Sequence, residues 1–252
     1  MRKLIFPFIM LSCIQINAQG SIKVNSDRPD EADATYIIER GYLQVEHGFF
    51  FEREISNDSL IRTYGLQDVT LRLGLLPKIE FQILYSLINR DHVELKTNEF
   101  GIGSAKLGLK YSVGTQKGIL PSFSVLGSMS YPSVVSKEFR TDHKQYTFAL
   151  LFQNELKNAE ISYNVGFNKE KNTPFEWVYA ICLSKDFNEK LSGYIEHYSH
   201  LQKNEAEVSF DSGLGYTVNN LLILDVAGGI TVNQNIFFFT VGLSYLIPKK
   251  IF

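Results

Sequence analysis

Between residues 41 and 247 the sequence repeats one pattern, segments of about ten residues in which apolar side chains alternate with small or polar ones. In 159–168, for example, apolar Ile161, Tyr163 and Val165 alternate with polar Ser162 and Asn164. A period of two is typical of strands whose two faces meet different surroundings. About twelve such segments can be drawn, at 41–54, 61–76, 79–89, 100–114, 119–131, 145–156, 159–168, 175–185, 190–201, 205–218, 221–232 and 236–247.

The connections and the apolar face favour a closed barrel over a β-sandwich. Connections after the even-numbered segments are tight, whereas those after the third and fifth, at 90–99 and 132–144, are long. The connections after the first, seventh and ninth are intermediate, and the one at 233–235 is shorter than this alternation expects. The apolar face carries aromatic residues in nearly every segment, as in transmembrane barrels with aromatic girdles. We therefore expect an all-β, antiparallel, up-and-down transmembrane β-barrel with both termini in the periplasm.

The first nineteen residues resemble a secretory signal peptide. Arg2 and Lys3 precede an apolar stretch from residue 4 to residue 16, and small and polar residues follow. We expect cleavage after Gln19; a lipoprotein signal ending at Cys13 is the alternative, although the preceding residues fit its Leu-rich box poorly. The predicted organisation is a signal peptide at 1–19, a periplasmic or plug segment at 20–40, the barrel at 41–247 and a tail at 248–252.

Composition excludes several other classes of protein. Acidic residues outnumber basic ones, 27 to 25, so the chain lacks the basic footprint of a nucleic-acid-binding protein. After the signal region no apolar stretch approaches the length of a membrane-spanning helix. Cys182 is the single cysteine beyond that region, so no internal disulfide is expected. An exported chain of this kind would be stabilised by its hydrogen-bonded sheet.

Several short motifs along the chain resemble the outer-membrane family named after the MetA pathway of phenol degradation. They are Asp27-Arg28-Pro29-Asp30, Gly41-Tyr42-Leu43-Gln44-Val45-Glu46, Tyr64-Gly65-Leu66, Leu71-Arg72-Leu73-Gly74, Gly101-Ile102-Gly103, Lys106-Leu107-Gly108-Leu109-Lys110, Asp211-Ser212-Gly213 and Gly242-Leu243-Ser244-Tyr245. The chain departs from the family pattern at Glu31-Ala32-Asp33 and at Ser104. The resemblance implies a barrel in the outer membrane of a Gram-negative-type bacterium that passes small hydrophobic or aromatic molecules.

Charged residues recur on the polar face of the predicted strands. If that face lines the lumen, these side chains form a selective constriction, because charges in a narrow passage set electrostatic barriers. The alternative is a salt-bridged network that packs the interior. The predicted lumen-lining residues are Glu46, Arg72, Lys106, Lys110, Glu196, Asp211 and Asp225.

The segment before the first strand allows two interpretations. It could enter the lumen as a plug, with Arg28 meeting the carboxylates of the polar face. It could instead form a periplasmic turn built on Asp27 and Pro29, followed by Asp30.

Catalytic motifs are few in this sequence. It contains no Gly-x-Ser-x-Gly or His-Glu-x-x-His motif and no phosphate-binding loop. His197 and Ser199 would share the lipid-facing side of one strand, where an outer-membrane lipid hydrolase would need them. We expect no enzyme, no cofactor and no metal site. The expected function is that of a passive channel for small molecules, with the barrel in contact with outer-membrane lipid. The alternative is a non-transporting structural or binding barrel. The remote alternative is the lipid hydrolase.

Overall fold

The computed structural model describes residues 22–56, 59–203 and 205–252, so the predicted signal peptide lies outside the described residues. The described residues form twelve antiparallel strands that close into one barrel, each strand beside its sequence neighbours and β1 beside β12. The strands are β1 (Leu43–Ser56), β2 (Ser59–Leu76), β3 (Ile79–His92), β4 (Thr97–Gly114), β5 (Ser122–Ser130), β6 (Gln145–Glu155), β7 (Ala159–Glu170), β8 (Glu176–Asp186), β9 (Leu191–Gln202), β10 (Glu205–Asn219), β11 (Leu222–Thr231) and β12 (Ile236–Leu246).

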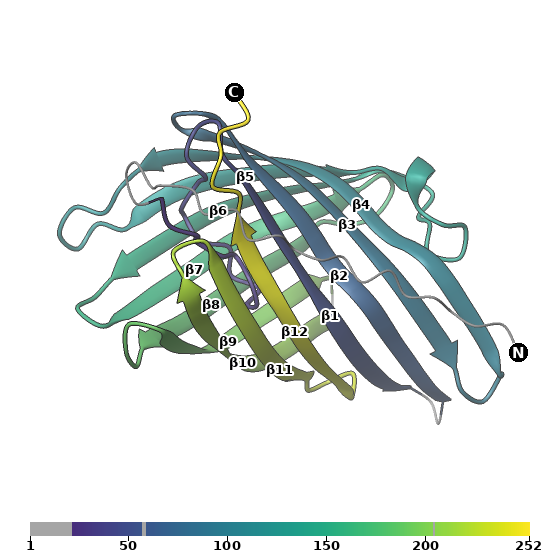
Figure 1. Cartoon of the computed structure of the whole chain (residues 1–252). Helices are drawn as coiled ribbons and strands as arrows, with labels where there is room; N and C mark the ends of the chain where they lie inside the picture. Colours follow the sequence, from purple (N-terminus) through teal and green to yellow (C-terminus); the bar gives the residue numbers. More distant parts are fainter. Residues whose placement is uncertain (1–21, 57–58, 204) are drawn as a thin grey trace, which may run out of the picture.

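The predicted strand count and barrel class are confirmed, and the segment boundaries agree with the strands to within a few residues. Figure 1 shows the strands tilted around a single barrel. Closure pairs Gln44 with Leu246, so the chain enters and leaves the barrel at one end, which we call the terminal end. The opposite end is the loop end. No helix among the described residues has the length and hydrophobicity needed to cross a membrane.

The predicted alternation of short and long connections holds only in part, because β2 begins at Ser59, soon after β1 ends at Ser56, and the connection from Gly114 to Ser122, expected to be tight, is longer than the β3–β4 turn. Residues 90–99 were expected to form a long loop, but β3 continues to His92 and β4 begins at Thr97. Arg90 pairs in register with Glu99, and their side chains approach to 3.8 Å. Polar residues continue this hairpin because main-chain hydrogen bonds, and not apolar contacts, hold the two strands together. The loop between β5 and β6 is long, and it contains the short 3-10 helix η1 (Pro132–Val134).

The two faces of the wall differ as the alternation predicts. Large apolar side chains are exposed on the outside of nearly every strand, whereas buried polar residues such as Gln44, Thr70 and Ser124 face inward. Outward aromatic residues meet across neighbouring strands: the Phe123 and Phe152 rings stack with centroids 4.9 Å apart, and Phe152 stacks on Tyr163 at 5.3 Å. An apolar, aromatic-rich exterior suits contact with lipid.

We predict that Val241→Arg destabilises the folded barrel in lipid vesicles by about 2–4 kcal/mol, because Val241 faces outward near the middle of β12. The matched control is Val232→Arg, just beyond the end of β11 at the loop end, with an expected cost of about 0–1 kcal/mol. Urea unfolding of both variants in vesicles measures the difference. Equal costs would contradict the assignment of the outer face to lipid.

Candidate functional site in the barrel interior

Residues 22–42, which we call the N-terminal segment, lie inside the barrel. Figure 1 shows this segment as a dark purple trace within the ring of strands. Val24, Ala32 and Ile38 are each at most 6% exposed. The Val24 amide also donates to the Asn220 carbonyl at the terminal end of the wall, at 2.7 Å. The segment therefore fills part of the lumen.

A buried arginine and lysine join the N-terminal segment to the wall. The Arg72 guanidinium is fully buried; its Nε lies 2.8 Å from Glu80 Oε1 and its Nη1 lies 2.9 Å from Glu46 Oε1. The same Nη1 lies 3.0 Å from Asp27 Oδ2 of the segment, and Lys110 Nζ lies 2.7 Å from that oxygen. Two cations of the wall thus share one carboxylate of the segment.

Arg28 makes the second anchor. Its Nη2 donates to Asp225 Oδ1 at 3.1 Å and to Thr240 Oγ1 at 3.0 Å. The guanidinium lies over Gly48 and Gly242, which pair with each other in register. A Cβ at Gly48 would come within 2.2 Å of Arg28 Nη2, and one at Gly242 within 2.4 Å. Glycine is therefore required at both positions for the arginine to reach the wall.

Side chains of the wall also form hydrogen bonds with the backbone N–H and C=O groups of the segment, which has no regular secondary structure of its own. The Thr35 amide donates to Gln153 Oε1 at 3.0 Å, and the Thr35 carbonyl accepts from Ser124 Oγ at 2.6 Å. The Ile38 amide donates to Glu80 Oε2 at 2.7 Å. Buried backbone groups need such partners, so the polar inner face holds this particular path of the chain.

Glu196 of β9 makes the same kind of contact with an earlier part of the segment. Both Glu196 oxygens accept backbone amides, from Glu31 at 2.7 Å and from Ala32 at 2.8 Å. Asp211 of β10 is the register partner of Glu196; the Glu196 carboxylate meets the segment inside the barrel, and Asp211 lines the cavity beside that segment. Close to these carboxylates lie the Cys182 thiol and the Asp30 carboxylate.

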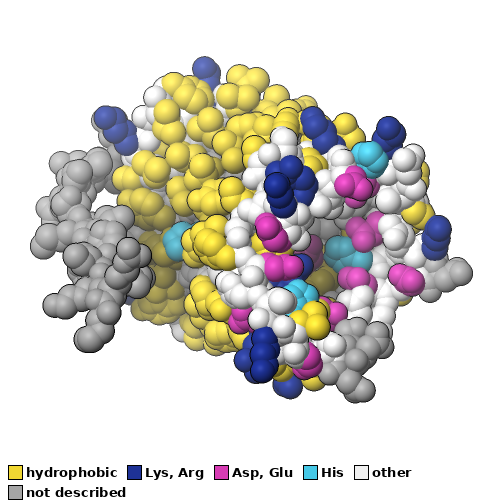
Figure 2. Space-filling view, turned by 90° about the vertical axis from the view of Figure 1, so that its right-hand side faces the viewer, with side chains coloured by type: hydrophobic (Ala, Val, Ile, Leu, Met, Phe, Trp, Pro, Cys, Tyr) yellow, Lys and Arg dark blue, Asp and Glu magenta, His cyan; other side chains and the backbone are white. Residues whose placement is uncertain are grey.

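A cavity of about 400 Å³ lies against the segment, and we call it the vestibule. Figure 2 shows a hollow in the molecule ringed by acidic and histidine side chains. Residues 27–31 of the segment line the vestibule together with polar residues of the wall, including Lys106 and His200. Its apolar lining includes Phe50, Leu84, Leu126, Val178, Tyr198 and Phe238. The cavity therefore combines a charged surface on the segment with partly apolar walls.

All of the residues predicted to line the lumen lie on the inner side of the barrel. Glu46, Arg72 and Lys110 form one buried group with Asp27, whereas Asp225 meets Arg28. The remaining three, Lys106, Glu196 and Asp211, lie elsewhere around the wall. Their selectivity role stays a prediction. Sequence reasoning missed Gln153, Cys182 and Thr240, although each occupies an inward position that the alternation of its strand could have identified.

The pair considered for hydrolysis does not form a hydrogen-bonded dyad. The Ser199 hydroxyl donates to the Glu207 carbonyl at 2.6 Å. His197 is hydrogen-bonded through Nε2 to the Tyr179 hydroxyl at 2.9 Å and through Nδ1 to the Ser209 carbonyl at 3.0 Å. Each side chain therefore has other partners.

We predict that Arg72→Ala lowers the free energy of unfolding by about 3–5 kcal/mol, because it leaves the buried Glu46 and Glu80 carboxylates without their cation. The control is Arg90→Ala, whose half-exposed pair with Glu99 at 3.8 Å contributes at most about 1 kcal/mol. Urea unfolding of both variants in the same vesicles gives the comparison. A small effect of Arg72→Ala would mean that water or protons compensate the carboxylates.

Known protein structures share this barrel architecture. The COG4313 outer membrane channel from Pseudomonas putida F1 superposes with a TM-score of 0.66 at 7% identity, covering 92% of this chain and 100% of that one. The KdgM porin gives a TM-score of 0.55 at 8% identity, covering 80% and 98%. No curated protein matches in sequence. The family model described as "Putative MetA-pathway of phenol degradation" matches residues 26–247, so the chain belongs to that family.

Proposed function

We propose that this protein is an outer-membrane channel for small molecules, and that the N-terminal segment controls passage through its lumen. The observation that carries the proposal is a closed barrel, apolar outside and polar inside, whose vestibule ends on a segment held by side chains. A barrel of this size leaves an interior too wide to be filled by wall side chains alone. The similarity in fold to an outer membrane channel and a porin supports this assignment.

The proposed orientation has both termini in the periplasm and the loop end outside the cell. Even-stranded barrels of this class have short periplasmic turns and longer external loops. The connections at the terminal end include the tight turns after β2 and β10, and the long β5–β6 loop is at the loop end. The vestibule would then receive molecules from outside, and the N-terminal segment would separate it from the periplasm.

The proposed cargo is small and neutral or cationic, with an aromatic or apolar part. Phe50, Tyr198 and Phe238 offer apolar contacts in the vestibule, while Asp30 and Glu31 make part of its surface acidic. The family description, which refers to phenol degradation, agrees with aromatic cargo. We assign no catalytic step, since His197 and Ser199 are each engaged with other groups.

The alternative of a non-transporting barrel rests on the buried network around Arg72. Three carboxylates within 3.0 Å of one guanidinium could fix the segment permanently. The two functions differ in whether the segment moves, so the decisive experiment controls its mobility.

We predict that a disulfide between Ala32→Cys and the natural Cys182 keeps the channel at low conductance and that reductant restores conductance. Ala32 and Cys182 belong to one buried cluster, so the bond would fasten the segment to β8. Single-channel recording in planar bilayers, with the disulfide verified by intact mass, makes the measurement. The control is Ala32→Cys combined with Cys182→Ser, which should not respond. Equal conductance of the oxidised and reduced protein would exclude gating by the segment.

We also predict that Lys106→Glu makes the channel more cation-selective, because Lys106 is a cation lining the vestibule. The reversal potential under a salt gradient measures the change. Lys117→Glu, in an exposed turn at the terminal end, is the control with the same change in charge. An identical shift in both variants would show that the ion path does not pass Lys106.

A further inference from the structure

A thiol and carboxylates meet where the N-terminal segment contacts β8 and β9. One oxygen each of Asp30 and Glu196 and the Cys182 sulfur all lie within 4.8 Å of one another. Cys182 and Glu196 are register partners with 2% and 4% exposure. Asp30 reaches them because the next two backbone amides of the segment donate to the Glu196 carboxylate. The wall and the segment thus supply the three groups together.

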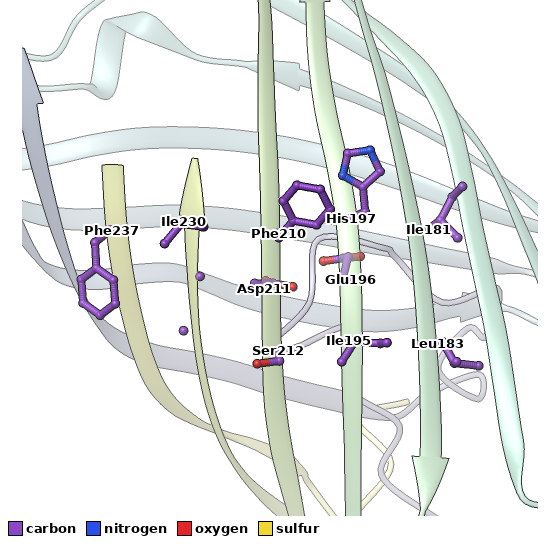
Figure 3. A pocket seen from close by; sticks show the side chains of 12 residues that line it. Ile181, Leu183, Ile195, Glu196, His197, Phe210, Asp211, Ser212, Ile230 and Phe237 are labelled. Atoms are coloured by element: carbon purple, nitrogen blue, oxygen red, sulfur yellow. The ribbon is translucent and has the colours of Figure 1, made fainter. Parts of the chain in front are cut away.

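Asp211 provides a second and separate sign of a ligand. This residue is 9% exposed, and its Oδ1 is buried without a hydrogen-bond partner among the described residues. Its other oxygen, Oδ2, accepts a hydrogen bond from the Tyr194 hydroxyl at 3.5 Å, and its register partner across the strand pair is Glu196. Figure 3 shows the carboxyl ends of the two side chains turned toward each other. A buried carboxylate oxygen aimed at another carboxylate needs a cation or a proton between them.

The described residues supply no cation at this place. In the part of the chain that the structure describes, none of the ion pairs involves Asp30, Glu196 or Asp211. Three basic groups of the interior are engaged elsewhere, Arg28 with Asp225, and Arg72 and Lys110 with Asp27, and Lys106, which also lines the vestibule, makes no ion pair with the described residues of the cluster. Apolar residues surround Cys182, which strengthens electrostatic interactions there. Buried charges of one sign are tolerated when they coordinate a metal.

We infer that Asp30, Cys182, Glu196 and Asp211 bind a divalent transition metal ion, with Zn²⁺ as the ion that fits best. Zn²⁺ takes a thiolate and carboxylate oxygens in four-coordinate sites, whereas Mg²⁺ and Ca²⁺ prefer oxygen alone. The Cys182 thiol would release its proton to solvent on binding. The backbone amides that donate to Glu196 would orient this ligand.

The position of the site determines how an ion reaches it and how a bound ion would affect the segment. Asp30 and Asp211 both line the vestibule, so an ion can reach the cluster from that cavity. Because one ligand belongs to the N-terminal segment and three to β8, β9 and β10, a bound ion would tie the segment to the wall. This consequence rests on the proposed channel function, whereas metal binding itself does not.

The test is titration of the folded, chelator-treated barrel in detergent with Co²⁺, because Co²⁺ bound to a thiolate has a charge-transfer absorption in the near ultraviolet. We expect a single Co²⁺ per barrel with this absorption, and its displacement by Zn²⁺. Cys182→Ser should abolish the absorption, and Asp211→Asn should weaken binding roughly tenfold or more. Glu160→Gln, at an inward position of β7 outside the cluster, should bind as the unmodified protein does.

Absence of both the absorption and Zn²⁺ uptake in the folded protein would overturn the inference and would mean that protons balance the carboxylates. Zn²⁺ affinity unchanged in Cys182→Ser would overturn the thiolate ligand. The heat-dependent gel migration of folded barrels verifies the fold of each variant. Conductance of the metal-free protein is recorded separately, so a protein that binds metal but does not conduct would refute the channel and leave the metal site standing.

Discussion

The pairing of β1 with β12 is the constraint on which the rest of the structure depends. It gives the last strand edge a partner, which is required where lipid offers the backbone no hydrogen bonds. Closure also turns the alternation within each strand into two surfaces, one apolar and one polar. The polar residues then face a shared interior, and the chain that precedes β1 can enter it at the terminal end.

Within this interior the wall acts as a binding surface for its own N-terminal segment. The segment has no ladder of backbone hydrogen bonds, so Glu80, Gln153 and Glu196 accept its amides. Ion pairs at Asp27 and Arg28 fasten its first part to the wall. The segment is held by separate polar contacts and is not a strand of the sheet. Some of these contacts can therefore break while the strand pairing of the barrel stays intact. This property makes a gated channel physically reasonable.

The sequence predicted the strands well because a two-sided wall imposes its period on each strand locally. The predicted segments 79–89 and 100–114 were nevertheless too short at the loop end, where polar Arg90 and Glu99 continue the pairing without an apolar face. The inward residues were also predictable, Glu46 and Asp225 among them. Their partners were not, because contacts such as Arg28 with Asp225 join residues far apart in the chain, and two interpretations of the N-terminal segment remained open.

The sequence by itself determined the class of fold, the number of strands and which side chains face inward, because these follow from alternation over a few neighbouring residues. Tertiary structure decided where the N-terminal segment runs and which charges meet. Gly48 and Gly242 illustrate the difference: in the sequence they are small residues in strands, and in the barrel they leave the space that Arg28 occupies. The grouping of Cys182 with Asp30 and Glu196 is similar: the β8–β9 pairing places Cys182 beside Glu196, but Asp30 comes from a distant part of the chain and joins them only because the segment lies inside the barrel.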